Sequence, residues 1–334
     1  MALEKSNGRQ PHPVFGRQLQ PRATYSLDAD VERVAGFFVG EPRPTVRTLT
    51  QTSDRSTLSR VSAHVQGHPD VVLSGRIAPA LHGLGLLEAI PEERLIELAD
   101  PNDTDGDSIS GTVHWRKMPS GAQRVGRFGW KAVHPSVAEQ TAEAFQQDIG
   151  ITSQRRLQPN CTRRQAECKV QPTGANEPGS PEIVDDLFDR VVAFTANLAV
   201  PAARPVDSRQ GRQLFHAANC DGCHVPSHSV EMQNGAVSTI WPYTDLLLHD
   251  MGPDLADPVT HGDALLSEWR TAPLWGLGLA LRLNQSTGLL HDGRAATVDE
   301  AILWHGGEAL RSREFFEELS TSERQALVRF VLAL

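Results

Sequence analysis

Apolar residues recur at helical spacing in the middle of this chain. Residues 135–150 have Pro135 where a helix can begin and Gly150 where one can end. Within this segment, apolar residues lie at multiples of four: Val137, Phe145 and Ile149. Residues 183–198 step by three or four through apolar positions: Ile183, Leu187, Val191, Phe194 and Leu198. Both patterns predict helices that bury these positions, and the acidic first turn of residues 91–100 predicts a third helix.

The last third of the chain predicts three more helices. Residues 208–219 form a short amphipathic segment that contains Gly211 and Phe215. Capping-box signatures open the two helices near the end: Thr297 with Glu300, and Ser320 with Glu323. The final helix places four apolar residues on one face: Leu327, Phe330, Val331 and Leu334. We expect the first and last of these helices to pack against each other.

Loops and linkers separate these helices. From residue 1 to about residue 80 prolines are frequent, and the Val/Thr-rich stretches 45–50 and 71–73 predict a few short strands among loops. Residues 157–181 are rich in Pro, Gly and Asn and predict a surface loop. Residues 201–205, PAARP, stop the preceding helix, and we expect a domain boundary there.

Composition excludes several classes of protein. The 334 residues include 41 acidic and 32 basic side chains, a formal net charge of -9, which argues against a broad nucleic-acid-binding surface. No apolar run approaches the roughly 20 residues that a membrane-spanning helix needs. Residues 1–25 lack the apolar stretch of a secretory signal, so this segment taken alone indicates a cytoplasmic protein.

One motif carries chemistry. Cys220, Cys223 and His224 form the C-x-x-C-H pattern of covalent haem c attachment. In such sites two thiols add across the two vinyl groups at one porphyrin edge, and the adjacent imidazole is thereby held beneath the iron as its proximal ligand. The pattern therefore predicts one haem c, with Cys220 and Cys223 as attachment points and His224 as an iron ligand.

Other roles for the cysteines have weaker support. A structural zinc site could combine Cys220 and Cys223 with Cys161 and Cys168, but six residues separate the latter pair instead of the usual two to four. A thioredoxin-like redox pair would need a preceding strand of a βαβ unit, which the sequence lacks. Because haem c is attached outside the cytoplasm, where thiols are oxidised, we expect Cys161 and Cys168 to form a disulfide.

A low-spin haem needs a sixth ligand, usually the thioether of Met or the imidazole of His. Only Met232 and Met251 follow the motif, and Met251 lies in the more ordered-looking context. We favour Met251, with His291 close behind. The other candidates are His249 and His305.

Further residues could surround the haem. Arg270 and Arg294 could form bidentate hydrogen bonds with its propionates, although most arginines are simply solvated. Four tryptophans could line the pocket or belong to the core: Trp241, Trp269, Trp275 and Trp304.

A run of acidic residues resembles a calcium loop. Asp103, Asp105 and Asp107 alternate within ADPNDTDGDSISG, but Pro101 and Thr112 occupy the first and last ligand positions of an EF-hand. A solvated acidic turn is the alternative that we favour over a Ca²⁺ site.

Several longer blocks resemble a known family. They are SGRIAPALHGLGLLEAIPE (74–92), GRFGWKA (126–132), CTRRQAEC (161–168), PYTDLLLHDMGPDLAD (242–257), EWRTAPLWGLG (268–278) and LHDGRAATVDEAILWHGGEA (290–309). Together they are similar to the di-haem oxidoreductases often labelled thiol oxidoreductases, which are distantly similar to bacterial di-haem cytochrome c peroxidases and MauG-type enzymes. The resemblance implies a periplasmic protein with two cytochrome c-like halves, in which one haem does oxidative chemistry and the other relays electrons.

The chain departs from this family in two ways. Family members carry another C-x-x-C-H near the N-terminus, and this sequence has none. We therefore expect an N-terminally truncated chain that starts inside the first haem domain, which would also explain the missing leader. In the peroxidases a ligating Met often precedes HDG, whereas this chain has Leu290 there.

These observations predict a mainly α protein. Residues 201–334 are expected to form a cytochrome c-like domain with one haem, and residues 1–200 a loop-rich, mostly helical remnant of the first domain with a few short strands. We expect a periplasmic electron-transfer protein or oxidoreductase with a redox protein or small electron donor or acceptor as partner, and no peroxidase turnover by this chain alone. The alternative is a haem-free or zinc-binding remnant without catalytic activity.

Overall fold

The computed structural model describes the following residues: 2–4, 45–52, 57–64, 72–161, 168, 173–204, 208–232, 234–259, 261–283 and 288–334. Three expectations therefore lie partly outside the described residues: the irregular region at 5–44, residues 162–167 and 169–172 of the polar stretch, and the end of the linker at Pro205.

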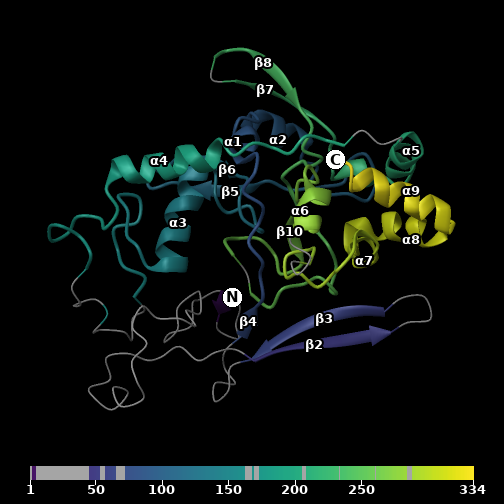
Figure 1. Ribbon diagram of the computed structural model, residues 1–334, viewed down its shortest axis with the longest axis horizontal. Helices are drawn as coiled ribbons and strands as arrows, with labels where there is room; N and C mark the ends of the chain where they lie inside the picture. Colours follow the sequence, from purple (N-terminus) through teal and green to yellow (C-terminus); the bar gives the residue numbers. More distant parts are fainter. Residues whose placement is uncertain are drawn as a thin grey trace.

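Helices make up most of the regular secondary structure of the described residues (Figure 1). They are α1 (Leu84–Glu88), α2 (Glu92–Leu98), α3 (Val137–Ile149), α4 (Asp185–Ala196), α5 (Arg209–Ala217), α6 (Leu277–Leu283), α7 (Val298–Leu303), α8 (Leu310–Glu318) and α9 (Thr321–Val331), with 3₁₀ turns η3 (Cys220–Gly222) and η4 (Gly307–Ala309).

The strands of the described residues pair two by two in antiparallel sheets. They are β1 (Ala2–Glu4) with β4 (Val72–Ser74), β2 (Thr45–Thr52) with β3 (Thr57–His64), β5 (His114–Lys117) with β6 (Gln123–Gly126), β7 (His228–Glu231) with β8 (Val237–Ile240), and β9 (Leu248–Asp250) with β10 (Glu268–Arg270). No sheet in this part of the chain is wide enough to form a layer of its own, which fits a mainly α architecture.

The predicted helix at 135–150 forms, but its start differs from the prediction. Ser136 is the N-cap and accepts a hydrogen bond from the Glu139 backbone N–H, so the helix begins at Val137 and Pro135 lies outside it. A hydroxyl can satisfy a free N–H of the first turn, whereas a proline side chain cannot. Gly150 ends the helix with a φ of 72°, a left-handed conformation that glycine adopts without strain.

The predicted buried faces of α3 and α4 are partly wrong. Ile149 is 61% exposed, and on α4 Leu187 and Phe194 are 52% and 68% exposed. Phe188 is instead 4% exposed and packs in a cluster with Ala142 of α3. The sequence contains two overlapping four-residue spacings on α4, and contact with α3 selects the one that includes Phe188.

The predicted pairing of the first and last C-terminal helices is confirmed. Helix α5 lies against α9, and the Phe215 and Phe330 rings meet edge to face with centroids 5.4 Å apart. Gly211 makes the approach possible, because a Cβ there would collide with the Ala326 carbonyl oxygen and lie 2.5 Å from the Phe330 Cβ. Ser320 and Glu323 complete the capping box that starts α9.

One core cluster contains residues from both sides of position 200. It joins Leu87 and Phe128 of the first region to Leu246 and Trp275 of the second. Helices α5, α7, α8 and α9 gather at one end of the molecule, away from α3 and α4 (Figure 1). Helices α5, α7 and α9, together with the segments beside them, line the site described below.

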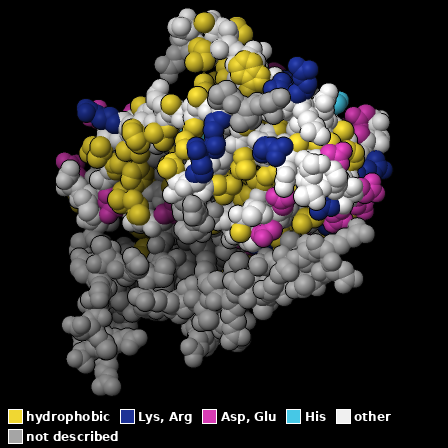
Figure 2. Space-filling model, turned by 45° about the vertical axis from the view of Figure 1, so that its right-hand side comes forward, with side chains coloured by type: hydrophobic (Ala, Val, Ile, Leu, Met, Phe, Trp, Pro, Cys, Tyr) yellow, Lys and Arg dark blue, Asp and Glu magenta, His cyan; other side chains and the backbone are white. Residues whose placement is uncertain are grey.

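Two surface features bear on the partners. None of the helices within the described residues is long and apolar enough to cross a bilayer. On the face in Figure 2, Lys and Arg side chains lie scattered among apolar and acidic ones and form no continuous basic patch. This face therefore lacks the clustered positive charge on which nucleic-acid binding depends.

Candidate functional site

The cysteine motif follows directly after α5. Asn219 has a φ of 54°, a left-handed conformation that Asn tolerates better than most residues, and it turns the chain into the 3₁₀ turn η3. The turn closes with a hydrogen bond from the His224 N–H to the Cys220 carbonyl at 2.9 Å. Gly222 lets Ile109 approach, since a Cβ at that position would lie 2.5 Å from the Ile109 Cδ1.

The motif opens onto an apolar cavity of about 220 Å³. Most of the candidates from the sequence line it: Cys220, Cys223, His224, Met251, Arg270 and His291. The other candidate ligands, His249 and His305, line it as well, whereas Arg294 does not. Helices α5, α7 and α9 all contribute apolar wall residues, among them Phe215, Ile302 and Leu327.

Cys220 and Cys223 are free thiols in this structure. Burial raises the pKa of Cys220 to about 12 and also raises the pKa of Cys223, so both thiols are protonated at neutral pH. Cys161 and Cys168 form a disulfide and so offer no thiolates for a zinc site shared with the motif. In the described part of the chain, the only group of three or more possible metal ligands with converging donor atoms is Asp103, Asp105 and Asp107.

The protonation and hydrogen bonding of His224 suit a metal ligand. Its Nδ1 lies 3.0 Å from the Tyr243 carbonyl oxygen, which can only accept, so Nδ1 carries the proton. Burial lowers the pKa of His224 to about 4, so the ring is neutral and Nε2 keeps its lone pair. Tyr243 is held in turn by edge-to-face contacts with Phe215 and Phe330. The arrangement fixes both the tautomer and the orientation of the ring.

His249 is already occupied at both nitrogens. Its Nε2 lies 2.8 Å from Asp245 Oδ2 and its Nδ1 lies 2.7 Å from Glu308 Oε2. Burial opposes the charged form, but hydrogen bonds from Cys223 and Asp245, together with the negative charge of Asp245, outweigh burial and raise the pKa of His249 well above its ordinary value. The ring is therefore an imidazolium without a lone pair, so this candidate ligand from the sequence does not fit the role.

His305 is the better-placed candidate. It follows the end of α7, and its Nδ1 donates to the Ala301 carbonyl at 2.7 Å. Burial lowers its pKa, which keeps the ring neutral. Within the described residues, its Nε2 has no hydrogen-bond partner. His305 thus has the same fixed tautomer as His224 on the wall of the same cavity.

His291 and Met251, the two residues favoured from the sequence, also line the cavity. The His291 ring stacks on Trp269 with centroids 3.7 Å apart and planes 10° apart. Burial, together with the nearby Arg294, lowers the pKa of His291 to about 3. Met251 packs beside Leu255 and Trp269.

The two arginines have different surroundings. Arg270 is buried in the cavity wall, where its Nε donates to the Gly129 carbonyl at 2.8 Å and its Nη1 to the Thr271 carbonyl at 3.0 Å. Arg294 gives its Nε and Nη2 to Asp292 and its Nη1 to a backbone carbonyl, and it lies over Trp304. These bonds tie Arg294 to Asp292 and to the backbone, and of the two arginines only Arg270 lines the cavity.

Sequence reasoning missed several residues of the site. Of the four tryptophans named above, only Trp269 lines the cavity, whereas Trp130, which no pattern singled out, does so too. Asp245 and Glu308, the carboxylates that hold His249, lie within two of the family blocks quoted above, but no motif marks either residue. No spacing rule could have found them.

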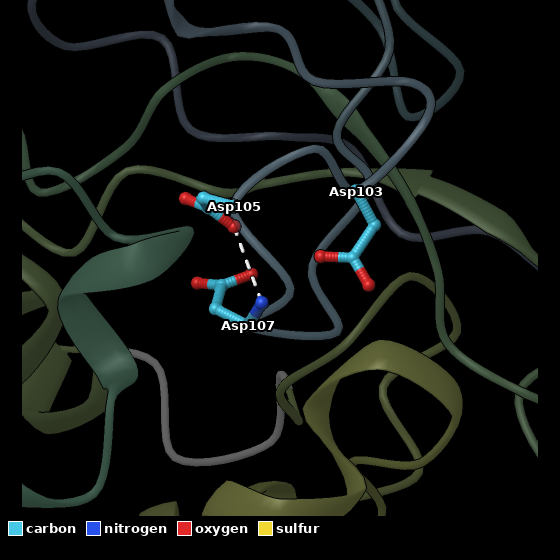
Figure 3. Close-up of side chains that lie close together, drawn as sticks. All are labelled: Asp103, Asp105 and Asp107. Carbon is cyan, nitrogen blue, oxygen red and sulfur yellow. Dashed lines mark hydrogen bonds between the residues drawn. The ribbon is translucent and has the colours of Figure 1, made fainter.

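The acidic turn, whose three aspartates Figure 3 shows, leads into Ile109, which lies against Gly222 of the motif. Donor oxygens of Asp103, Asp105 and Asp107 lie within 4.8 Å of one another. Backbone N–H groups already use some of these oxygens: Asp105 Oδ1 accepts from Asp107 at 3.2 Å, and Asp107 Oδ1 accepts from Ile109 at 2.8 Å. The carboxylates thus shape the turn that carries Ile109 to the cavity, and any cation would be bound only weakly.

A comparison with family models assigns the chain to a class of haem proteins. The model of the family described as "Di-haem oxidoreductase, putative peroxidase" matches residues 41–334. Because the match spans most of the sequence, the chain belongs to the di-haem oxidoreductase family, a family of haem-dependent redox proteins.

Solved structures and curated proteins add little. One solved structure, Kuenenia stuttgartiensis hydrazine synthase pressurised with xenon, matches with 19% identity and a TM-score of 0.31, over 46% of this chain and 57% of the other. At that level of similarity the match supports no conclusion about fold or function. No curated protein matches the chain.

Proposed function

We propose that this protein is a c-type haem protein that transfers electrons in the periplasm. One haem would be joined to Cys220 and Cys223 by thioether bonds, with His224 as the proximal ligand of its iron. The observation that carries the proposal is that two free, protonated thiols and a neutral imidazole with a fixed tautomer share one apolar cavity. Membership of the di-haem oxidoreductase family supports it further.

The donor set fits this cofactor. The addition of a thiol across a vinyl group keeps the hydrogen of the thiol in the product, so each free cysteine would supply both the sulfur and the hydrogen of its thioether link. When bound, the haem supplies a centre that gains and loses one electron. The chain's own part is to hold His224 through the Tyr243 carbonyl and to exclude water with apolar walls from α5, α7 and α9.

We propose His305 as the second histidine that would bind the haem iron. The support is its unpartnered Nε2 and the bond from its Nδ1 to Ala301, which match the needs of an iron-bound imidazole. Met251 and His291, which the sequence favoured, remain the alternatives that spectroscopy separates. Arg270 is the arginine that we propose for a propionate, because Arg294 is bound to Asp292.

We propose that residues 201–334 form the haem-binding part and residues 1–200 a separate first part. Ile109 and Trp130 from the first part contribute to the cavity wall, so the first part would shield the haem as well as support it. Covalent haem attachment and the Cys161–Cys168 disulfide both favour a periplasmic location. A redox protein or small electron carrier would be the partner, and we expect no peroxidase turnover by this chain alone.

The test is expression of the chain in exported form together with a haem c maturation system. We expect haem that stays attached after denaturation, and a mass increase that corresponds to one haem. Cys220→Ala should weaken or abolish the attachment, whereas Cys161→Ala, which removes a cysteine outside the motif, should leave it intact. A colourless exported product, or zinc in place of haem by metal analysis, would contradict the proposal.

A further inference from the structure

Trp269 lines the cavity, and the amino group of the buried residue Lys131 lies over its ring. Trp269 belongs to β10 and is 6% exposed. The Lys131 Nζ lies over its indole, 3.7 Å from the ring centroid, while the His291 ring stacks on the same indole. The Arg76 guanidinium adds a second positive charge 5.6 Å from the ring centroid. The indole is thus the electron-rich partner of two cations.

The surroundings of Lys131 favour its charged form. The side chain has no exposed surface, and its Nζ donates to the carbonyls of Leu265 and Leu266, each at 3.0 Å, and to that of Glu268. An ammonium group has three N–H donors for three acceptors, whereas a neutral amine has two. Burial opposes this and lowers the pKa of Lys131 to about 7. The three carbonyls and the indole face bind the ammonium form and so oppose the effect of burial.

The charge changes what the indole can do. If Trp269 lost an electron, its ring would become positive at 3.7 Å from the ammonium, in an interior where charge repulsion is strong. Proton loss could not offset this, because the indole N–H donates to the Leu255 carbonyl at 2.8 Å, and a carbonyl does not take the proton. The neutral indole, by contrast, is stabilised by the cation.

We infer that Lys131 keeps Trp269 reduced, so that the redox centre of the cavity does not draw an electron from this wall. The inference rests on the proposed function, which puts that centre beside Trp269. The step that Lys131 opposes is the transfer of one electron from the indole to an oxidised one-electron acceptor, which is reduced in turn. Lys131 acts only by placing a positive charge beside the Trp269 ring and does not itself react.

The test uses a light-generated ruthenium(III) bipyridine oxidant, added to the haem-loaded protein, and peptide mass spectrometry of oxygen addition at each tryptophan. We expect Lys131→Met to increase oxidation of Trp269 by about tenfold or more, because one unit charge beside the ring is removed. Lys131→Arg keeps the charge and should keep the protection. Lys117→Met removes an exposed charge and should match the wild type.

A second comparison needs no substitution and so does not depend on how Lys131 variants fold. Trp269 and Trp275 are both 6% exposed, and no described cation lies over Trp275. In the unmodified protein Trp275 should therefore be oxidised more than Trp269. Equal oxidation of the two, or no change in a folded Lys131→Met, would overturn the inference. Because the oxidant is added from solution, absence of haem would count against the proposed function alone.

Discussion

The Nδ1 of His224 lies 3.0 Å from the carbonyl oxygen of Tyr243, a residue 19 positions further along the chain. Because the Nδ1 proton of His224 is used in this contact, the lone pair of the ring lies on Nε2 and is free to bind a metal ion. The carbonyl fixes the tautomer, and the aromatic contacts of Tyr243 with Phe215 and Phe330 fix the carbonyl. The packing of α5 on α9 is therefore part of the site.

His305→Ala should change the ligation of the haem without releasing it. The thioether bonds do not involve His305, so the covalent haem should remain, while the loss of one axial imidazole should shift the iron from low spin to high spin. Electron paramagnetic resonance and the visible spectrum measure this shift. Met251→Ala and His291→Ala are the matched controls and should leave the low-spin signals unchanged. A low-spin spectrum that persists in His305→Ala and disappears in either control would assign the ligand elsewhere.

Gly211→Ala should destabilise the protein by roughly 1–3 kcal/mol. A Cβ at this position would collide with the Ala326 carbonyl oxygen and lie 2.5 Å from the Phe330 Cβ, so α5 and α9 would have to move apart. Chemical denaturation measures the loss. Gly75→Ala is the control, because a Cβ there meets nothing within 4 Å. If both variants unfold at the same denaturant concentration as the wild type, the close approach of the two helices is wrong.

Phe188→Ala and Phe194→Ala should differ, although both remove a phenyl ring from α4. Phe188 is 4% exposed and packs against α3, so its truncation should cost about 3–5 kcal/mol. Phe194 is 68% exposed, and its truncation should change the free energy of unfolding by less than about 0.5 kcal/mol. Thermal melts of the two variants are a direct comparison. The reverse order would support the face of α4 that the sequence pattern predicted.

Stability should fall with pH as Glu143 becomes protonated. Burial alone would raise the pKa of Glu143, but His261, His134 and Arg156 outweigh it and lower the pKa to about 2 from an ordinary 4.5. A carboxyl whose pKa is lower in the folded state contributes stability above its unfolded pKa and loses it as the pH falls through the folded value. The loss from this group should reach about 3 kcal/mol between pH 4.5 and pH 2.

Urea denaturation over that pH range checks this expectation, with Glu143→Gln as the control. The variant cannot ionise at this position, so the corresponding part of the pH dependence should be missing. An unchanged slope of stability against pH in Glu143→Gln would show that other groups account for the acid sensitivity.

The sequence by itself determined the features that depend on neighbours along the chain. The spacing of Cys220, Cys223 and His224 is one such local pattern, and these residues begin in a 3₁₀ turn. The capping box at Ser320 and the helical periodicity after it are two more, and the helix that they predict forms. The expected packing of the first C-terminal helix on the last one is also confirmed, and the structure adds that Gly211 and Phe215 lie at the contact.

Only the tertiary structure decided which side chains complete the site. Glu308 holds His249 from 59 positions away, and this pair removes His249 from the candidate ligands. The Lys131 amino group lies over the Trp269 ring, and Arg294 forms an ion pair with Asp292. The periodicity of the sequence predicts neither contact. The physical reason is that protonation, tautomer and free donors are set by burial and by partners that folding brings together, whereas spacing along a chain sets only which residues share a turn or a face.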